Sequence, residues 1–154
     1  MTLYCDLDGV LADLEGGYKR AFGIETNKTL DNIDWALVNT VPNFFESIPL
    51  MKDAPSLWSS IAPHRPVILT GAPKELFEEA SANKREWVRR HIGDHVEVRC
   101  CRSSEKSKHC KPGDVLIDDW EKYRDRWVKA GGLWVTHVDA SKTIFVLRAM
   151  GVIQ

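Results

Sequence analysis

Two pairs of aspartates directly follow short apolar runs of the chain. Asp6 and Asp8 come after the first such run, and Asp118 and Asp119 come after the fourth. Alternate residues of an extended chain point to the same side, so Asp6 and Asp8 can face one cleft. Crowded carboxylates repel one another, and a divalent cation relieves that repulsion. Carboxylate oxygens suit Mg²⁺, which binds through a few of them together with a substrate phosphate. The four aspartates therefore predict a magnesium site.

A third polar strand end strengthens this interpretation. The second apolar run ends in Thr70 and Gly71, a hydroxyl donor followed by a residue without a side chain. Aspartate is also common in turns and helix caps, so either aspartate pair alone could be purely structural. Both pairs and Thr70 at predicted strand ends favour a site, because ligands of an open parallel sheet bind outside the carboxyl ends of its strands.

The apolar runs themselves predict the elements that position these side chains. Their spacing leaves room for helices between them, which indicates an α/β fold with a parallel sheet and helices on both faces. Between the first and second runs, residues 14–62 contain aromatic and helical stretches but no clear strand. We expect these residues to form a small helical insertion on a core of residues 1–13 and 63–154. The predicted strands are residues 3–5, 67–69, 96–98, 115–117 and 133–135.

Two of the helices have recognisable end signals. Pro73 is expected in the first turn of a helix that carries Leu76, Phe77 and later apolar residues at helical spacing. Ser141 is expected to cap the last helix, which should stop at Gly151.

Composition limits the possible classes of protein. The chain has 154 residues and 17.5 kDa, which indicates one domain. Hydrophobic residues make up 44% and charged residues 28%, which excludes a disordered tail, a fibre and a coiled coil. No apolar run approaches the ~20 residues that span a bilayer, and acidic residues occupy the N-terminus where a signal peptide would be apolar. We therefore expect a cytoplasmic protein with no membrane partner, whose four cysteines are reduced.

Charge is unevenly distributed along the chain. The net charge is −1, which argues against a dedicated nucleic-acid binder. Residues 1–62 carry four basic and nine acidic side chains, whereas residues 84–111 carry nine basic and four acidic ones. The basic segment could attract a phosphate ester, or it could be an ordinary solvated surface.

At these positions the chain resembles the haloacid dehalogenase (HAD) superfamily. Residues 6–10, Asp-Leu-Asp-Gly-Val, match its first motif, and residues 69–71 are similar to its second, a strand that ends in Thr or Ser. Asp118–Asp119 matches the acidic fourth motif. The third motif is a lysine upstream of the fourth strand; the context favours Lys106, with Lys108 as the alternative. The resemblance implies a Rossmann-like three-layer sandwich with a parallel central sheet and a small helical cap inserted after the first strand.

The same resemblance implies Mg²⁺-dependent hydrolysis of a phosphomonoester through an aspartyl-phosphate. Asp6 would be the nucleophile, and Asp8 would protonate the leaving oxygen and then deprotonate the attacking water. In this family the backbone carbonyl of the Asp8 position also faces the metal. Asp119 is expected to ligate the metal directly and Asp118 partly through water. The implied metal residues are Asp6, Asp8, Asp118 and Asp119.

The resemblance also assigns the residues around the phosphate. Thr70 would donate its hydroxyl and Gly71 its backbone N–H to phosphoryl oxygens, while Lys106 would neutralise the transferring group. Within the superfamily, residues 6–13 and the segment 44–49 resemble the 5'(3')-deoxyribonucleotidase-like branch most, which implies a nucleotide substrate.

Three aromatic residues of the insertion could stack on a base, namely Phe44, Phe45 and Trp35. They could equally be the core of the cap. Other functions remain open at this point: a phosphatase that acts on the 3' ends of nucleic acids or on another small molecule, and a HAD-like binding module without catalysis. A small phosphorylated partner is expected and a stable nucleic-acid complex is not. The sequence does not predict the oligomeric state.

Overall fold

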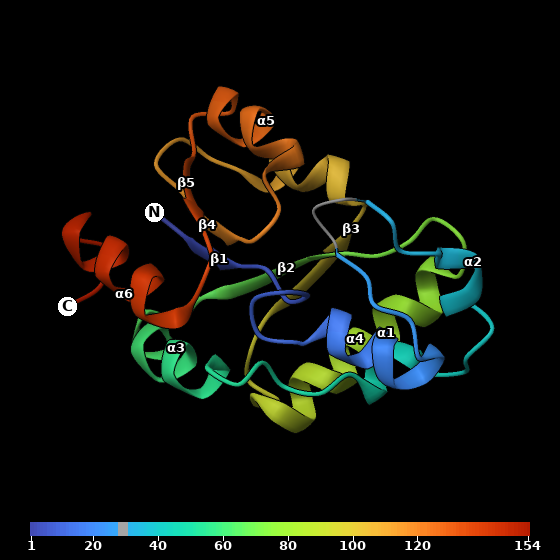
Figure 1. Cartoon of the computed structure of the whole chain (residues 1–154). Helices are drawn as coiled ribbons and strands as arrows, with labels where there is room; N and C mark the ends of the chain where they lie inside the picture. Colours follow the sequence, from blue (N-terminus) through green and yellow to red (C-terminus); the bar gives the residue numbers. More distant parts are fainter. Residues whose placement is uncertain (28–30) are drawn as a thin grey trace.

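The fold is built on a parallel sheet of five strands (Figure 1). The computed structural model describes residues 1–27 and 31–154. The strands lie in the order β3-β2-β1-β4-β5, and all neighbouring strands are parallel. This confirms the predicted α/β class. The strands are β1 (Leu3–Cys5), β2 (Val67–Gly71), β3 (Val98–Cys101), β4 (Val115–Asp118) and β5 (Leu133–Thr136).

The predicted third strand is displaced by two residues. It was expected at residues 96–98, whereas β3 begins at Val98, which pairs with Ile68, and ends at Cys101, which pairs with Gly71. The register is set by pairing with β2 along its whole length, which apolar composition alone does not reveal.

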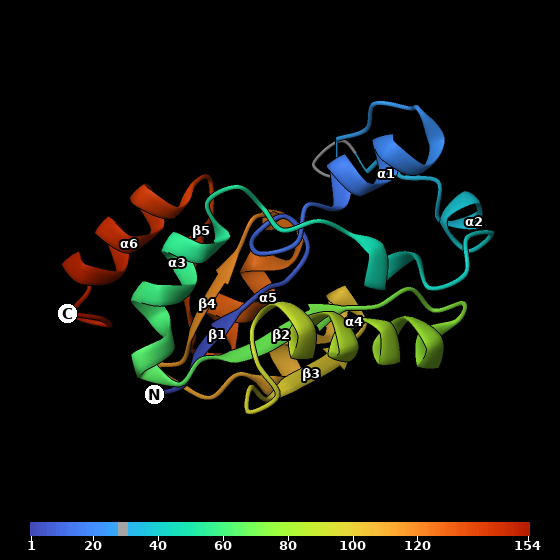
Figure 2. The same ribbon diagram turned by 90° about the horizontal axis from the view of Figure 1, so that it is seen from below.

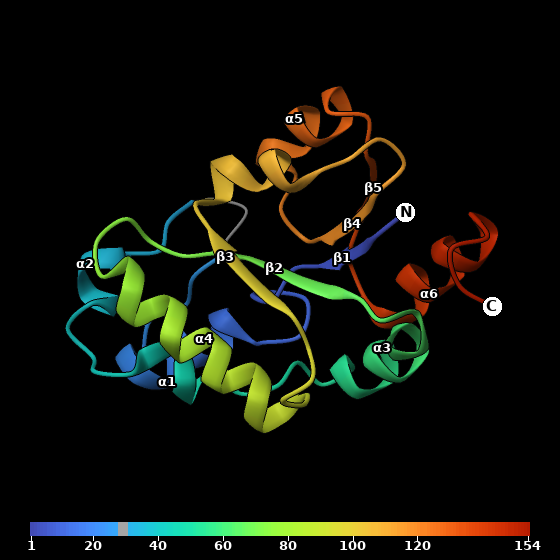
Figure 3. The same cartoon turned by 180° about the vertical axis from the view of Figure 1, so that it is seen from behind.

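Side chains alternate between two apolar layers, one on each face of the sheet. Leu3 and Cys5 face the larger cluster, whereas Tyr4 faces a smaller one together with Leu116 and Trp127. Trp127 lies on α5 (Arg124–Lys129), which covers the smaller cluster. Figures 1 and 3 show α5 on one side of the sheet and α3, α4 and α6 on the other. The alternation is that of strands with both faces buried.

The two long helices of the core start where local backbone and cap chemistry dictate. The helix α4 (Phe77–His91) begins after Leu76, whose φ of 57° is left-handed, so the expectation that Pro73 lies in its first turn is wrong. The helix α6 (Ala140–Ala149) is capped by Asp139, whose carboxylate accepts from the Lys142 N–H at 2.8 Å. The expected cap Ser141 lies inside the helix instead.

The segment between β1 and β2 is helical, as its composition indicated. Its elements are α1 (Leu14–Phe22), α2 (Trp35–Val38), η2 (Phe44–Ser47), α3 (Ala54–Ile61) and η3 (Ala62–His64). Figure 2 shows α1 and α2 beyond the carboxyl ends of the strands, where a cap would cover a site. By contrast, α3 packs against α6 on the core. The boundaries of the cap remain a prediction, and residues 28–30 of it lie outside the described part of the chain.

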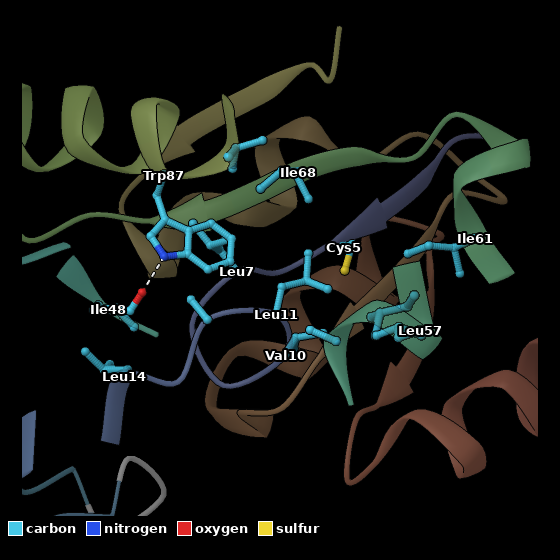
Figure 4. Close-up of a cluster of buried hydrophobic side chains, with 14 of the residues drawn as sticks. Cys5, Leu7, Val10, Leu11, Leu14, Ile48, Leu57, Ile61, Ile68 and Trp87 are labelled. Atoms are coloured by element: carbon cyan, nitrogen blue, oxygen red, sulfur yellow. Dashed lines mark hydrogen bonds between the residues drawn. The ribbon is translucent and has the colours of Figure 1, made fainter. Parts of the chain in front are cut away.

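A hydrogen bond joins this segment to the core. Trp87 of α4 is 1% exposed and donates from Nε1 to the carbonyl oxygen of Ile48 at 2.6 Å (Figure 4). Leu7, Leu11 and Leu14 lie in the same cluster, so the chain that leaves β1 is anchored by burial. The loop that carries Asp6 and Asp8 is thereby held between α4 and the segment after η2.

Two further short helices flank the carboxyl ends of the strands: η4 (Ser103–His109) after β3, and η5 (Glu121–Tyr123) after β4. Among the described residues, no helix is both long and apolar enough to cross a membrane.

Candidate active site

Asp6 and Asp118 lie side by side because their strands are neighbours. The pairing of Cys5 with Ile117 brings the carboxyl ends of β1 and β4 together, and the Asp6 N–H donates to the Ile117 carbonyl at 2.9 Å. Lys106 reaches both carboxylates from η4. Its Nζ lies 2.8 Å from Asp6 Oδ1 and 2.7 Å from Asp118 Oδ2.

This group is nearly withdrawn from solvent. Asp6, Lys106 and Asp118 are 2%, 7% and 4% exposed. Burying an ionised group is costly unless it is paired, and the lysine provides that pairing. The alternative lysine, Lys108, points away: its Nζ pairs with Glu105 at 2.6 Å, and its side chain is 72% exposed.

Three of the predicted metal residues form a cluster. Carboxylate oxygens of Asp6, Asp118 and Asp119 lie within 4.8 Å of one another. Gly9 permits this approach: it has φ +84°, and a Cβ at this position would lie 2.0 Å from Asp119 Oδ2. A donor set made only of carboxylate oxygens fits Mg²⁺ rather than a softer metal.

Asp8, the fourth predicted metal residue, lies outside this carboxylate cluster. Its Oδ2 is ion-paired with Lys84 of α4, and Lys84 also donates to Thr70 Oγ1 at 3.2 Å. Thr70 itself is 0% exposed, one residue before Gly71 at the wall of the cavity. The role that the resemblance gives the backbone carbonyl of Asp8 remains a prediction.

Lys84 is the site residue that the sequence analysis missed. As part of the basic segment 84–111, Lys84 is expected either to attract a phosphate ester or to lie on a solvated surface. In the structure its side chain is only 1% exposed. A signal was available, because Ala80, Trp87 and Val88 stand four before, three after and four after it, and all three are buried. Residues at those spacings share a helix face, so Lys84 belongs to the buried stripe.

A cavity of about 250 Å³ opens onto these carboxylates. Gly71 lines it, and the space beside Gly71 is taken by Ser103 of η4, whose Oγ would lie 2.1 Å from an added Cβ. A side chain at position 71 would therefore clash with η4. The lining includes Asp6, Asp8, Gly71, Lys106 and Asp118, together with Lys74 and an aromatic set of Trp35, Phe45, Trp120, Tyr123, Trp127 and Trp134.

The predicted base-stacking residues divide between the cavity and the cap interior. Phe45 and Trp35 line the cavity and stack on each other with ring centroids 6.5 Å apart. Phe44 is 3% exposed and packs between Phe45 and Phe22, with ring centroids 5.4 and 6.1 Å away. Phe44 and Phe45 are both buried in the apolar core, and of the two only Phe45 lines this cavity, together with Trp35.

Burial shifts the pKa of several titratable groups, among them Cys5, Cys101 and His137. Burial raises the pKa of the Cys5 thiol well above its usual value, and the neighbouring Asp6 adds to this shift. Burial raises the pKa of Cys101 to about 11. The pKa of His137 is lowered by burial, against the opposing effect of nearby carboxylates. These thiols are protonated at neutral pH, as expected for reduced structural cysteines.

Several cations of the basic segment pair with acids of the same segment. Arg89 and Arg90 pair with Glu86, and Arg99 pairs with Glu97, all at 2.7 Å. These pairs are partly exposed, and the segment keeps its excess of basic over acidic side chains.

Known proteins resemble this chain in sequence and in fold. No family model matches the chain. A protein from Bordetella bronchiseptica (strain ATCC BAA-588 / NCTC 13252 / RB50) with the name "Putative 5'(3')-deoxyribonucleotidase" is 28% identical over 139 residues, covering 77% of this chain and 74% of the relative. The protein of that name from Bordetella pertussis (strain Tohama I / ATCC BAA-589 / NCTC 13251) has the same identity and coverage.

Solved structures match over nearly the whole chain. A HAD-superfamily hydrolase from Ehrlichia chaffeensis superposes with a TM-score of 0.58 at 11% identity and covers 97% of this chain and 96% of its own. A hydrolase from Streptococcus pneumoniae TIGR4 superposes with a TM-score of 0.55 at 14% identity, over 96% and 97%. The backbone therefore has the fold of the haloacid dehalogenase superfamily, as the motifs implied.

Proposed function

We propose that this protein is a Mg²⁺-dependent phosphomonoester hydrolase that acts through an aspartyl-phosphate on a nucleotide. The observation that carries the proposal is the cluster of buried Asp6, Lys106 and Asp118 with half-buried Asp119 beside the cavity. A nucleophilic carboxylate beside a buried cation and a carboxylate metal site suits phosphoryl transfer through an aspartyl-phosphate.

The residues of the chain take distinct parts in the proposed reaction. Asp6 attacks phosphorus, and the bond to the leaving oxygen breaks. Asp8 gives that oxygen a proton and later takes one from the water that cleaves the aspartyl-phosphate. Lys106 balances the negative charge on the transferred group, and Thr70 and Gly71 donate to its oxygens. Bound Mg²⁺, held by Asp6, Asp118 and Asp119, would supply positive charge for the approach of one anion to another.

The aromatic lining supports a nucleotide as substrate. Trp35 and Phe45 face the cavity from the insertion, and Trp120 and Tyr123 face it from the segment after β4. Stacking of a base on an aromatic ring contributes about 1–3 kcal/mol. The names of the Bordetella relatives point to the same class of substrate.

The test is a panel of phosphomonoesters, including 5'- and 3'-deoxynucleotides, assayed with and without Mg²⁺. We expect turnover that EDTA removes and that Asp6→Asn abolishes without unfolding the protein. Asp125→Asn, an exposed acid on α5, is the matched control and should keep full activity. Undiminished hydrolysis by Asp6→Asn contradicts the covalent mechanism.

The nucleotide part of the proposal has its own test. Trp35→Ala should raise KM for deoxynucleotides about 5- to 100-fold, as expected for the loss of one stacking contact, and leave KM for p-nitrophenyl phosphate unchanged. Equal KM changes for both substrates would count against a base-binding wall.

A further inference from the structure

A lysine is buried directly behind the proposed acid–base residue. Lys84 of α4 is 1% exposed, and its Nζ makes three contacts. It pairs with Asp8 Oδ2, donates to Thr70 Oγ1 at 3.2 Å, and lies 4.5 Å from the centroid of the Phe45 ring. Burying a charge is costly, so a lysine on the buried face of a helix needs partners that compensate its charge.

The three groups that Lys84 contacts come from three separate parts of the chain. Asp8 follows β1, Thr70 lies in β2, and Phe45 lies in η2 of the insertion. Asp8 and Phe45 line the cavity, whereas Lys84 is not among the described residues that line it. Lys84 can therefore reach a substrate only through the groups it holds.

We propose that Lys84 is a positioning residue, which fixes the Asp8 carboxylate and the Thr70 hydroxyl in the orientation that catalysis needs. The inference rests on the proposed function, because it assigns Asp8 the proton transfers described above. Without the ammonium, the Asp8 carboxylate would lose this ion pair, and proton transfer to a leaving oxygen depends on the position of the carboxylate to within about 1 Å.

The contact between Lys84 and Thr70 affects the direction in which the hydroxyl hydrogen of Thr70 points. A hydroxyl has one donor hydrogen and two acceptor lone pairs. Lys84 has only hydrogens to donate, so it occupies a lone pair of Oγ1 and directs the hydroxyl hydrogen elsewhere. The Thr70 hydroxyl itself donates in a long contact of 3.5 Å to the Gly71 carbonyl oxygen. The arrangement presents Thr70 as a donor, which is the role proposed for it toward phosphate.

A purely structural ion pair makes a different prediction from a positioning role. If Lys84 only stabilises the fold, its loss should slow all substrates alike. If it aims Asp8, its loss should slow the substrates whose leaving group needs a proton. A deoxynucleotide releases a sugar alkoxide, which needs protonation, whereas p-nitrophenyl phosphate releases a stable phenolate, which needs little.

The experiment compares Lys84→Met and Lys84→Arg with the wild type on these two substrates, measuring leaving-group release in single turnovers and KM. General acid catalysis contributes about 10²–10⁴-fold. We expect Lys84→Met to slow deoxynucleotide cleavage about 100-fold and p-nitrophenyl phosphate cleavage less than tenfold, with KM changed less than threefold for both. Arg85→Met removes an exposed cation from the neighbouring position of α4 and should match the wild type.

Lys84→Arg keeps the positive charge, and it is the variant to measure if Lys84→Met does not fold. Its planar guanidinium places its donors differently, so it should show a smaller selective loss, about tenfold on the deoxynucleotide alone. Equal losses on both substrates, or no loss in either variant, overturn the positioning role.

A crystal structure of the folded variant decides the same question without turnover. Asp8 and Thr70 side chains in changed rotamers support the inference, and unchanged rotamers overturn it. This readout is independent of the proposed function, whose own failure would appear as an absence of hydrolysis by the wild type across the whole panel.

Discussion

Replacing Lys106 by Met tests the electrostatics of the site directly. Lys106 is 7% exposed and lies between two buried carboxylates, at 2.8 Å from Asp6 and 2.7 Å from Asp118. Methionine keeps the length and the apolar stem of the side chain but removes the ammonium. Asp6 and Asp118 would then face each other across a poorly solvated gap, without the cation that now separates them.

The expected loss of stability follows from burial. Removing one partner of a buried pair costs about 3–5 kcal/mol, because the charge left behind stays buried. The matched control is Lys108→Met on the same short helix, whose pair with Glu105 is exposed. Exposed pairs contribute about 0.2–1 kcal/mol. At about 2–4 °C per kcal/mol for a chain of this size, Lys106→Met should lower Tm by about 6–20 °C and Lys108→Met by less than about 4 °C.

The assay is thermal and urea unfolding of both variants in EDTA and again with Mg²⁺. Mg²⁺ should raise the Tm of Lys106→Met more than that of the wild type, because the cation then neutralises carboxylates that have lost their lysine. The free energy of binding adds to stability by mass action. If Lys106→Met in EDTA stays within 1 kcal/mol of the wild type, the reasoning about the buried pair is refuted.

Three further predictions concern other residues. Gly9→Ala should weaken Mg²⁺ binding at least tenfold by calorimetry, because a Cβ would lie 2.0 Å from Asp119 Oδ2 at a φ of +84°; an unchanged affinity contradicts the metal cluster. At pH 8, iodoacetamide should label Cys101 more than tenfold more slowly than half-buried Cys100 in the folded protein, since burial raises the pKa of Cys101 to about 11; equal rates by mass spectrometry contradict this. Burial lowers the pKa of His137, so the unfolded state binds the extra proton and stability falls as the pH drops below about 6.5. His137→Asn should reduce the slope of unfolding free energy between pH 7 and 5 by up to about 1.4 kcal/mol per pH unit, and identical slopes would exclude His137 as the source.

Much of the core could be predicted because its signals are local. Strands buried on both faces are short apolar runs, and β1, β2, β4 and β5 lie where those runs are. The polar residues at their carboxyl ends meet because neighbouring parallel strands end at one edge of the sheet. Asp6, Asp118 and Asp119 therefore come together as their positions in the sequence indicated.

Details that depend on strand pairing or side-chain packing were harder to predict from the sequence. The start of β3 is set by its register with β2, and the start of α4 by the left-handed backbone of Leu76. Phe44 and Phe45 are adjacent and chemically identical, yet only Phe45 faces the cavity. Adjacent residues point in different directions, and only the surrounding elements decide which direction is the interior.

By itself, the sequence indicated the succession of strands and helices along the chain and the meeting of Asp6, Asp118 and Asp119 at the sheet edge, and the motif context favoured Lys106. Only the tertiary structure decided that Lys106 is buried between Asp6 and Asp118 and that Lys84 pairs with Asp8, 76 residues away. The physical reason is that a lysine on a helix is expected at the surface unless a partner is known that compensates its charge in the interior. That partner lies far away in the sequence, and folding alone brings the two together.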